Sequence, residues 1–371
     1  MRRCRPSRWH AWFSLLCLAT AACGSNDSAS SAGCAGEQPD CALAVAAAEA
    51  GLWLGAAIAD PQNDLEQTTI GVDFNSVTAE NAMKWGSLAP TVGAYDFTAA
   101  DAIVDFAAER RARLRGHVLV WRDQQPADLR ERILGSDDAP ATARSLLTEH
   151  VGTVVGRYRG RVAQWDVVNE PLAPLGAERD RSLFQRVLGD TYIDEAFALA
   201  RAADPDARLF LNEFFYEHRA DDARVTAFRV LVQEILGRGV ELDGIGIQGH
   251  FFGLLTSVPQ RDAFEAMLRS FTDLGVAVEI TELDVSIRHF DGEADPLAAQ
   301  AKVYGDIVAA CRAVAGCLGI TTWGMADSST WLDRNDPFAD LAPHLPLLLD
   351  GEWMRKPAYD ATRAAVLGRW D

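Results

Sequence analysis

Two glutamates far apart in the sequence each end a short, mostly apolar run. Glu170 ends the run in residues 165–171 (WDVVNEP), and Glu282 ends the run in residues 280–284 (ITELD). Hydrolysis of a glycosidic bond with retention needs one carboxyl group that protonates the leaving oxygen and one carboxylate that attacks the anomeric carbon, roughly 5 to 5.5 Å apart. We interpret Glu170 as the acid/base and Glu282 as the nucleophile of such a pair. Taken singly, either glutamate is better explained as a surface charge or as an acid at a helix N-terminus.

The surrounding sequence alternates short apolar or β-branched runs with longer segments of helical periodicity. This alternation favours a parallel sheet wrapped by helices. The candidate strands are residues 53–58, 76–81, 113–120, 162–169, 209–213, 244–248, 276–282 and 318–324. The candidate helices are residues 99–110, 141–158, 190–203, 222–237, 261–274 and 297–314. The alternation of strands and helices predicts an α/β fold, the (β/α)8 TIM barrel.

Several of these strands end in residues that a hydrophobic core does not favour. They are Glu80, Asn81, His117, Asn169, Glu170, Gln248, His250, Glu282 and Trp323. In a (β/α)8 barrel the carboxyl ends of all strands meet at one rim, so side chains far apart in the sequence converge there. The fourth and seventh strands face each other across the barrel mouth, which predicts an active site between Glu170 and Glu282.

The composition is that of a soluble globular protein, with 49% hydrophobic and 24% charged residues. The formal net charge is -18, and such an acidic surface repels polyphosphate. Nucleic acid is therefore not an expected partner, whereas a neutral polysaccharide carries no charge to be repelled. An acidic surface also aids solubility, which explains the charge equally well.

The N-terminal segment has the features of an export signal. Residues 1–23 combine an arginine-rich start, an apolar run from Ala11 to Ala22 and small residues before Cys23, which predicts a signal peptide of the lipoprotein type. Residues 24–41 are rich in Ser, Gly and Ala and predict a flexible tether, and residues 42–371 are assigned to the catalytic barrel. We expect an exported protein, either attached to a membrane through a lipid at Cys23 or simply secreted.

Four further cysteines bear on export. Cys34 and Cys41 are near enough in the sequence to close a small loop, and Cys311 and Cys317 bracket five residues. Disulfides persist in oxidising compartments, so export favours both pairings, with free buried thiols as the alternative. No His/Cys cluster has metal-ligand spacing and no glycine-rich phosphate loop is evident in the sequence, so no cofactor and no metal are expected.

The ordered set of motifs resembles glycoside hydrolase family 10, the retaining endo-β-1,4-xylanases, from about Leu52 to the C-terminus. Besides the two glutamate segments, the matching stretches are residues 74–85 (FNSVTAENAMKW), 115–121 (RGHVLVW), 246–250 (GIQGH), 323–331 (WGMADSSTW) and 356–359 (KPAY). The resemblance implies an endo-1,4-β-xylanase that hydrolyses internal linkages of xylan with retention, through a covalent glycosyl-enzyme intermediate. It also implies that Cys311 pairs with Cys317.

The site residues follow from the same resemblance. It implies that His250 bonds Glu282 and that Asp284 orients His250, while Asn169 can donate to the sugar 2-hydroxyl. The residues expected to bind sugar are Glu80, Asn81, Lys84, His117, Trp121, Gln124, Gln248, Trp323 and Trp331. Tryptophan suits this role because the faces of a pyranose ring are apolar. The alternatives are core packing for the tryptophans and a satisfied core histidine for His250.

Two stretches depart from the family pattern. Arg122 stands where the family usually has His, and Asp128 stands where it often has Trp, and both are expected near the glycone side of the cleft. After the fifth strand, residues 212–217 (NEFFYE) replace a common Asn-Asp-Tyr-Asn and keep its aromatic content. These departures predict changed contacts with the sugars, whereas the acid pair is untouched.

Two other functions remain open on the sequence alone. A cellulase or mixed-linkage β-glucanase would use the same mechanism, and a non-catalytic, tethered carbohydrate-binding protein would need only the cleft. Both glutamates are present, which argues against the binding protein. Crowding by Lys84 and the tryptophans favours xylose, which lacks the 5-hydroxymethyl group. We expect a monomer whose partner is xylan or a related β-1,4-glycan.

Overall fold

The computed structural model describes residues 42–253, 256–334 and 343–371. The expected signal peptide (residues 1–23), the lipidation site Cys23, the tether (24–41) and the pairing of Cys34 with Cys41 lie outside the described residues. Within the described part of the chain, no helix combines the length and the apolar character needed to cross a bilayer.

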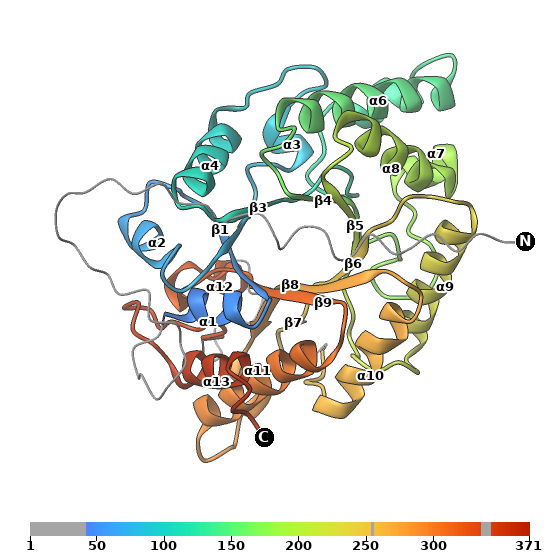
Figure 1. Ribbon diagram of the computed structural model, residues 1–371. Helices are drawn as coiled ribbons and strands as arrows, with labels where there is room; N and C mark the ends of the chain where they lie inside the picture. The colour runs from blue at the N-terminus through green and yellow to red at the C-terminus, as the bar shows by residue number, and fades with distance from the viewer. Residues whose placement is uncertain (1–41, 254–255, 335–342) are drawn as a thin grey trace, which may run out of the picture. The chain divides into compact units, whose positions relative to one another are not determined.

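Parallel strands form the centre of the described fold. They are β1 (Trp53–Ile58), β2 (Ser76–Ala79), β3 (Arg113–Gly116), β4 (Gln164–Asn169), β5 (Arg208–Glu213), β6 (Gly244–Ile247), β7 (His250–Phe251), β8 (Ala277–Val285) and β9 (Cys317–Thr322). All of these described strands except β7 close into a barrel, because β6 pairs with β8 and β9 pairs with β1 (Figure 1). The two-residue strand β7 pairs with the end of β8. The closed barrel confirms the predicted (β/α)8 TIM fold and each predicted strand.

Helices surround the barrel in Figure 1. In the described residues they are α1 (Leu43–Glu49), α2 (Asp64–Thr69), α3 (Trp85–Leu88), α4 (Thr98–Glu109), α5 (Leu129–Leu134), α6 (Ala139–Arg157), α7 (Leu183–Leu188), α8 (Thr191–Ala203), α9 (Ala223–Gly237), α10 (Arg261–Thr272), α11 (Pro296–Ala313), α12 (Trp331–Arg334) and α13 (Pro357–Val366), with 3-10 turns η1 (Ile287–Phe290) and η2 (Asp327–Ser329). The helices expected from periodicity are confirmed as α4, α6, α8, α9, α10 and α11.

Side-chain caps explain where two of the long helices begin. The Asp138 carboxylate accepts a hydrogen bond from the Ala141 backbone N–H before α6, and the Asp295 carboxylate accepts one from Ala298 before α11. Both helices carry a proline in the first turn, where its missing N–H costs nothing. An aspartate with proline one or two residues later is therefore a helix start that can be read directly from the sequence.

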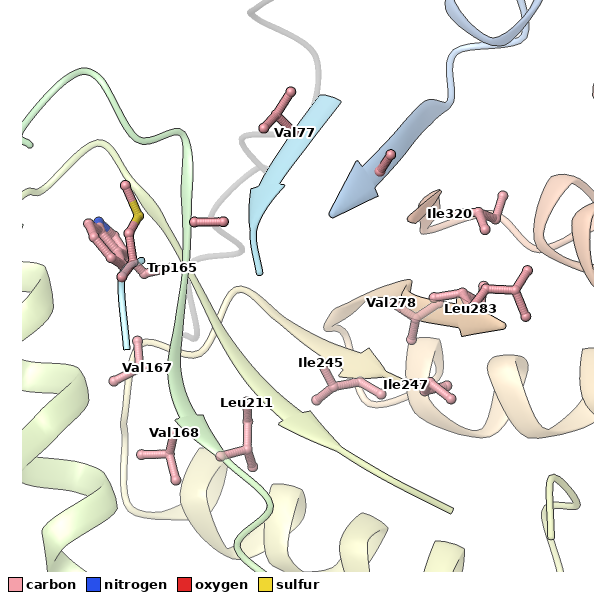
Figure 2. Packing of buried hydrophobic residues seen from close by; sticks show 14 of the residues in the cluster. Val77, Trp165, Val167, Val168, Leu211, Ile245, Ile247, Val278, Leu283 and Ile320 are labelled. Atoms are coloured by element: carbon pink, nitrogen blue, oxygen red, sulfur yellow. The ribbon is translucent and has the colours of Figure 1, made fainter. Parts of the chain in front are cut away.

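The main hydrophobic core lies between the strands and the helices. Trp165, Val167, Ile245 and Val278 are fully buried members of this core (Figure 2). The Trp165 ring lies 6.4 Å, centroid to centroid, from the ring of Tyr158 at the end of α6. A Cβ atom on Gly116 would stand 2.3 Å from the Trp165 ring. Glycine at position 116 therefore makes the space that this tryptophan fills.

The barrel interior, by contrast, contains charged and polar side chains. Arg113 of β3 pairs with Glu279 of β8 at 3.0 Å, and both contact Gln164 of β4. Nearer the carboxyl ends of the strands, Arg115 pairs with Asp166, and both side chains are fully buried. Removing one partner of a buried ion pair typically costs about 3–5 kcal/mol, because the other charge is left uncompensated. The first pair therefore ties β3 to the distant strand β8, and the second pair ties β3 to its neighbour β4.

Local irregularities interrupt the two strands that carry the candidate catalytic glutamates. The register of β4 against β5 shifts within residues 166–168, and the register of β8 against β9 shifts within residues 280–283. An extra residue in a strand turns the side chains that follow it relative to the regular alternation. Thr281 and Glu282, although adjacent in sequence, therefore both bond to the side chain of Asn212.

The third strand is shorter than the sequence pattern predicted. β3 ends at Gly116, whereas the apolar run continues to Val120. The chain leaves the ladder at His117 and rejoins the sheet through an isolated bridge between Val120 and Val168. The pattern could not reveal this break, because residues in a buried connection are as apolar as residues in a buried strand.

A disulfide ties the connection between α11 and β9. Cys311, in the last turn of α11, is bonded to Cys317, the first residue of β9, and their Cα atoms are 5.3 Å apart. The structure thus contains the pairing that spacing and family resemblance favoured. It anchors the start of the strand that leads to Trp323.

His218, in the connection after β5, is buried among aromatic rings. The rings of Phe215, Phe251 and Phe264 lie 4.6 to 6.1 Å from its ring, centroid to centroid. Neither ring nitrogen has a hydrogen-bond partner in the described part of the chain. Burial, with a smaller contribution from the charge of His250, lowers the pKa of His218 to about 3. The folded protein therefore keeps this imidazole neutral.

This neutral histidine predicts a loss of stability in acid. Below the unfolded-state pKa of about 6.5, His218 binds a proton in the unfolded chain, whereas in the folded chain it does not do so until about pH 3. The free energy of unfolding should thus fall by about 1.4 kcal/mol per pH unit in that window, with the full contribution present above it. In His218→Leu, denaturant titrations from pH 4 to 7 should show a shallower pH dependence. Phe197→Leu in α8, a buried position with no ring contact to His218, is the control, and it should lower stability equally at every pH. Parallel curves for His218→Leu and wild type would contradict the prediction.

Candidate active site

Glu170 follows the last residue of β4 and takes a left-handed backbone conformation, with φ at 54°. Its backbone N–H donates to the Asn212 carbonyl at 2.8 Å, which holds the turn against β5. Its carboxylate oxygen Oε1 accepts from Gln248 Nε2 at 2.9 Å and from Asn169 Nδ2 at 3.3 Å. The other oxygen, Oε2, accepts from the guanidinium of Arg122. This carboxylate is about 13% exposed, so a substrate can reach it.

Glu282 lies in β8 at the carboxyl end of the barrel and is 4% exposed. Its Oε1 accepts from Asn212 Nδ2 at 2.7 Å, and its Oε2 accepts from His250 Nε2 at 3.2 Å. Donors from β5 and β7 thus hold both carboxylate oxygens, which fixes the orientation of the carboxylate.

Asn212, at the end of β5, links the two glutamates. Its Nδ2 group donates to Glu282 and also to Asn169 Oδ1 at 2.8 Å, and Asn169 in turn contacts Glu170. Its Oδ1 accepts from the hydroxyl of Thr281 at 2.7 Å. Sequence reasoning left Asn212 out of the site, although an amide directly at the end of a strand was a usable signal.

A glycine in β6 makes room for this amide. A Cβ atom on Gly246 would stand 2.1 Å from Asn212 Oδ1 and 2.8 Å from the Thr281 side chain. Any larger residue at position 246 would therefore displace the link between the two glutamates.

His250 connects Glu282 to Asp284 and, through it, to Trp331 at the start of α12. Its Nδ1 lies 2.9 Å from Asp284 Oδ2, the same oxygen that accepts from Trp331 Nε1 at 2.9 Å. Burial disfavours a charge on His250, but the charges of Asp284 and Glu282 and their hydrogen bonds outweigh burial and raise its pKa to about 10. Both ring nitrogens therefore carry protons and donate to the two carboxylates.

The surrounding cations keep Glu282 ionised. Burial alone would raise its pKa, but the charge of His117, the hydrogen bond and charge of His250 and the charge of Arg115 together lower it to about 2. At neutral pH this carboxylate is an anion in a site largely closed to water, which is the state that a nucleophile requires.

Beneath the two glutamates, Asp166 holds Arg115 and His117. Its Oδ2 contacts Arg115 and lies 2.8 Å from His117 Nδ1, and all of these side chains are buried. Arg115 Nη1 also donates to the Thr281 carbonyl at 3.2 Å, next to Glu282. Arg115 and Asp166 were missed by sequence reasoning, because a charged residue inside a strand gives no sign of the partner that it will meet.

The expected glycone-side residues gather after β2. Lys84 Nζ donates to Asn81 Oδ1 at 2.9 Å, and Asn81 Nδ2 donates to Glu80 Oε1 at 3.1 Å. Lys84 Nζ also lies 5.1 Å from the centroid of the Trp121 ring. Burial lowers the pKa of Lys84, an effect that the charges of Glu282, Glu80 and Glu170 oppose. Arg334, at the end of α12, donates to Glu80 at 2.9 Å, a contact that the sequence did not indicate.

Trp323, directly after β9, and Trp331, at the start of α12, lie against the histidines of the site. The Trp323 ring is 5.2 Å from that of His117 and 6.2 Å from that of His250, centroid to centroid, in edge-on geometry. The Trp331 ring is 5.2 Å from that of His250. Phe252 extends this row of rings, since its ring lies 6.3 Å from Trp331 and 5.8 Å from Phe214.

Three residues of the stretch after β3 were expected near the glycone side of the cleft. Arg122 donates to the Oε2 and to the backbone carbonyl of Glu170 rather than lining only the glycone side. The carboxylate of Asp128 accepts from the Val92 N–H and from Arg132, so it stabilises the start of α5. Gln124 has an exposed side chain and a left-handed backbone with φ at 47°. Only barrel closure brings Arg122 to Glu170.

A buried ion pair holds the loop that follows Glu170. Glu213 at the end of β5 pairs with Arg224 of α9 at 2.8 Å, and its Oε2 accepts from the Leu172 N–H at 3.0 Å. Burial raises the pKa of Glu213 to about 7, against the opposing charge of Arg224. Arg224 also donates to the carbonyls of Ala173 and Gly176, so one guanidinium secures most of this loop.

No group of three or more His, Cys, Asp or Glu side chains in residues 42–253, 256–334 and 343–371 is arranged to hold a metal ion. The polar side chains at the barrel mouth instead bond to one another and to the two carboxylates. A (β/α)8 barrel with two glutamates held in one hydrogen-bonded network at the carboxyl ends of its strands is the arrangement of a barrel glycoside hydrolase. The chain matches the family model Glycosyl hydrolase family 10 over residues 42–365, and it belongs to that family.

The similarity extends over nearly the whole barrel. Endo-1,4-beta-xylanase 1 of Gibberella zeae is 32% identical over 317 residues, which cover 83% of this chain and 86% of the relative. Endo-1,4-beta-xylanase B of Paenibacillus barcinonensis is 37% identical over 292 residues, covering 76% and 86%. The crystal structure of native xylanase 10B from Thermotoga maritima matches with a TM-score of 0.80 and 30% identity, covering 88% of this chain and 98% of that chain.

The link through Asn212 predicts a specific loss on substitution. Asn212→Ala removes a hydrogen bond to a charged carboxylate, worth about 1.5–3 kcal/mol. It should therefore lower kcat/KM on a glycan substrate by about tenfold to hundredfold while the protein stays folded by circular dichroism. Glu195→Ala, which removes a surface ion pair with Arg144 between α6 and α8, is the control and should leave kcat/KM unchanged. Unchanged kcat/KM in Asn212→Ala would show that the link is dispensable.

Proposed function

We propose that this protein is an endo-1,4-β-xylanase, which hydrolyses internal linkages of xylan with retention of anomeric configuration. The observation that carries the proposal is the shared network around Glu170 and Glu282, in a chain that belongs to Glycosyl hydrolase family 10. The names of the relatives, which are endo-1,4-beta-xylanases, support xylan as the substrate.

In the first step Glu282 attacks the anomeric carbon. A new bond forms between this carbon and a Glu282 oxygen, while the bond to the leaving oxygen breaks and Glu170 delivers its proton to that oxygen. The cations around Glu282 support the attack, because they keep the carboxylate ionised at working pH. Asn212 and His250 hold its two oxygens in a defined orientation.

In the second step a water molecule replaces the leaving sugar. Glu170, now ionised, accepts a proton from this water, whose oxygen bonds to the anomeric carbon as the bond to Glu282 breaks. Two inversions at the same carbon give net retention. Asn169 is assigned the 2-hydroxyl, since its amide lies between the acid/base and Asn212.

The sugar-binding roles belong to the same proposal. The residues assigned to bind xylose units are Glu80, Asn81, Lys84, His117, Trp121, Gln124, Gln248, Trp323 and Trp331. Of these, Lys84 is 6% exposed and already bonded to Asn81. A rigid, crowded subsite of this kind favours xylose over glucose, because it leaves little room for a 5-hydroxymethyl group. Asp284 is assigned the role of orienting His250, with which it is in contact.

The stereochemistry of the products tests this function. In proton NMR during hydrolysis of xylan by the wild-type enzyme, the β-anomer should appear first and the α-anomer only later, through mutarotation. Glu282→Ala should lower kcat by about 10³-fold or more, whereas Glu265→Ala on the surface of α10 should be unaffected. An initial α-product would rule out retention, ordinary turnover by Glu282→Ala would rule out the nucleophile, and faster hydrolysis of a cellulose derivative would favour the glucanase alternative.

We also propose that the protein is exported and acts as a monomer, with residues 1–23 as signal peptide, 24–41 as tether and 42–371 as the catalytic barrel. A Cys at the end of the apolar signal supports lipid attachment at Cys23, with simple secretion as the alternative. Intact-mass analysis of the mature protein should give a chain that starts at Cys23 and carries added acyl mass, which Cys23→Ser should lack. An unmodified N-terminus beyond Cys23 would contradict the anchor.

A further inference from the structure

Arg122 occupies one whole side of the Glu170 carboxyl group. Its Nη2 contacts Oε2, and its Nη1 donates to the backbone carbonyl of the same residue at 2.9 Å. The contact is sheltered, since Arg122 and Glu170 side chains are 17% and 13% exposed. Two bonds to one residue hold the side chain relative to its own backbone, which defines where Oε1 and Oε2 point.

Every group in contact with the Glu170 carboxylate is a donor. Oε1 faces the amide groups of Gln248 and Asn169, and Oε2 faces the guanidinium. A guanidinium has no acceptor atom and does not give up its proton in proteins. A proton on the side of Oε2 that faces the guanidinium would therefore meet a donor, so Arg122 has to move before that side of Oε2 can pass a proton to a leaving oxygen.

We propose that Arg122 is a positioning residue that holds the Glu170 carboxyl group between substrates, and that the pair must open before Glu170 can protonate the leaving oxygen. The inference rests on the proposed acid/base role of Glu170. The closed pair favours the second step, in which Glu170 accepts a proton from water. It disfavours the first step, in which Glu170 must donate a proton to the leaving oxygen. The alkaline side of the pH profile should therefore fall at lower pH than it would without Arg122.

A neighbouring carboxylate gives the open state a second partner. Arg122 Nε lies 3.6 Å from Asp123 Oδ2, and the Asp123 side chain is 61% exposed. A guanidinium that turns away from Glu170 thus stays paired at the rim of the cleft. Opening the pair then exchanges one carboxylate for another and leaves no buried charge without compensation.

The other charged and titratable groups around Glu170 come from several elements. They are Lys84 after β2, Asp123 after β3, Asp180 after β4, Glu213 at the end of β5 and Tyr216 after it. Glu282 in β8 and His250 in β7 join Glu170 through the Asn212 network. All of these groups are present in both the wild type and an Arg122 variant. A difference between wild type and an Arg122 variant therefore reports this guanidinium and not the rest of the site.

The test compares two aryl xylobiosides that differ only in their leaving group. Phenyl xylobioside needs a proton on its leaving oxygen, whereas dinitrophenyl xylobioside does not. In Arg122→Met, the alkaline limb of kcat/KM for phenyl xylobioside should move up by about one pH unit. The acidic limb and the dinitrophenyl profile should stay where they are. Arg122→His, which restores the residue usual in the family, should show the same direction of shift.

Arg144→Met is the matched control, since Arg144 forms a surface ion pair with Glu195 between α6 and α8, away from the cleft. Its profiles should equal those of the wild type. An unmoved alkaline limb in both Arg122 variants, with folding intact by circular dichroism, would overturn the proposal. An equal change with both substrates would overturn it too, because a purely structural role does not depend on the leaving group.

Glu170→Ala separates this inference from the proposed function. That variant should lose phenyl xylobioside hydrolysis by about hundredfold or more while it retains kcat/KM for the dinitrophenyl substrate. Added azide should restore turnover on the dinitrophenyl substrate by forming a glycosyl azide. Equal loss on both substrates would refute the acid/base role itself, whatever the Arg122 variants show.

Discussion

The side chain of Asn212 couples the two glutamates, and the geometry of the site depends on it. Its amide bonds Glu282 on one side and Asn169 on the other, and its carbonyl oxygen accepts from Thr281. A planar amide presents donors and an acceptor in fixed directions. Movement of either glutamate by a fraction of an ångström would therefore weaken a bond at Asn212. Closure of the barrel sets the spacing of the strands so that this one side chain reaches Glu282 and also Asn169, which in turn contacts Glu170.

The two carboxyl groups differ in their surroundings, and the difference separates their roles. Glu282 lies among His117, His250 and Arg115, whose charges lower its pKa to about 2 in spite of burial. Glu170 is more exposed, and its oxygens meet two neutral amides and the single guanidinium of Arg122. The surroundings of Glu282 thus favour the anion, whereas Glu170 is held mainly by neutral amides and one guanidinium, which fits the two different roles proposed for them.

The charged interior of the barrel supports this division. Arg115 and Asp166 lie directly beneath the site, and Asp166 holds His117, whose ring contacts the ring of Trp323. Burying such ions costs desolvation energy, which their mutual attraction largely offsets when the geometry is good. Each ion has a defined partner, so the interior specifies one register of the strands. The Glu213–Arg224 pair extends the same principle outward and fixes the loop behind Glu170.

The sequence by itself determined the strands and main helices, and it marked most of the polar residues at the barrel mouth. These features follow from local causes: apolar periodicity, an aspartate and a proline at a helix start, and a polar residue at the end of an apolar run. The link through Asn212, the irregularities within β4 and β8, the early end of β3 and the partner of Arg122 were decided only by the tertiary structure. Each of them depends on how segments far apart in the chain align when the barrel closes, and no local pattern encodes that register.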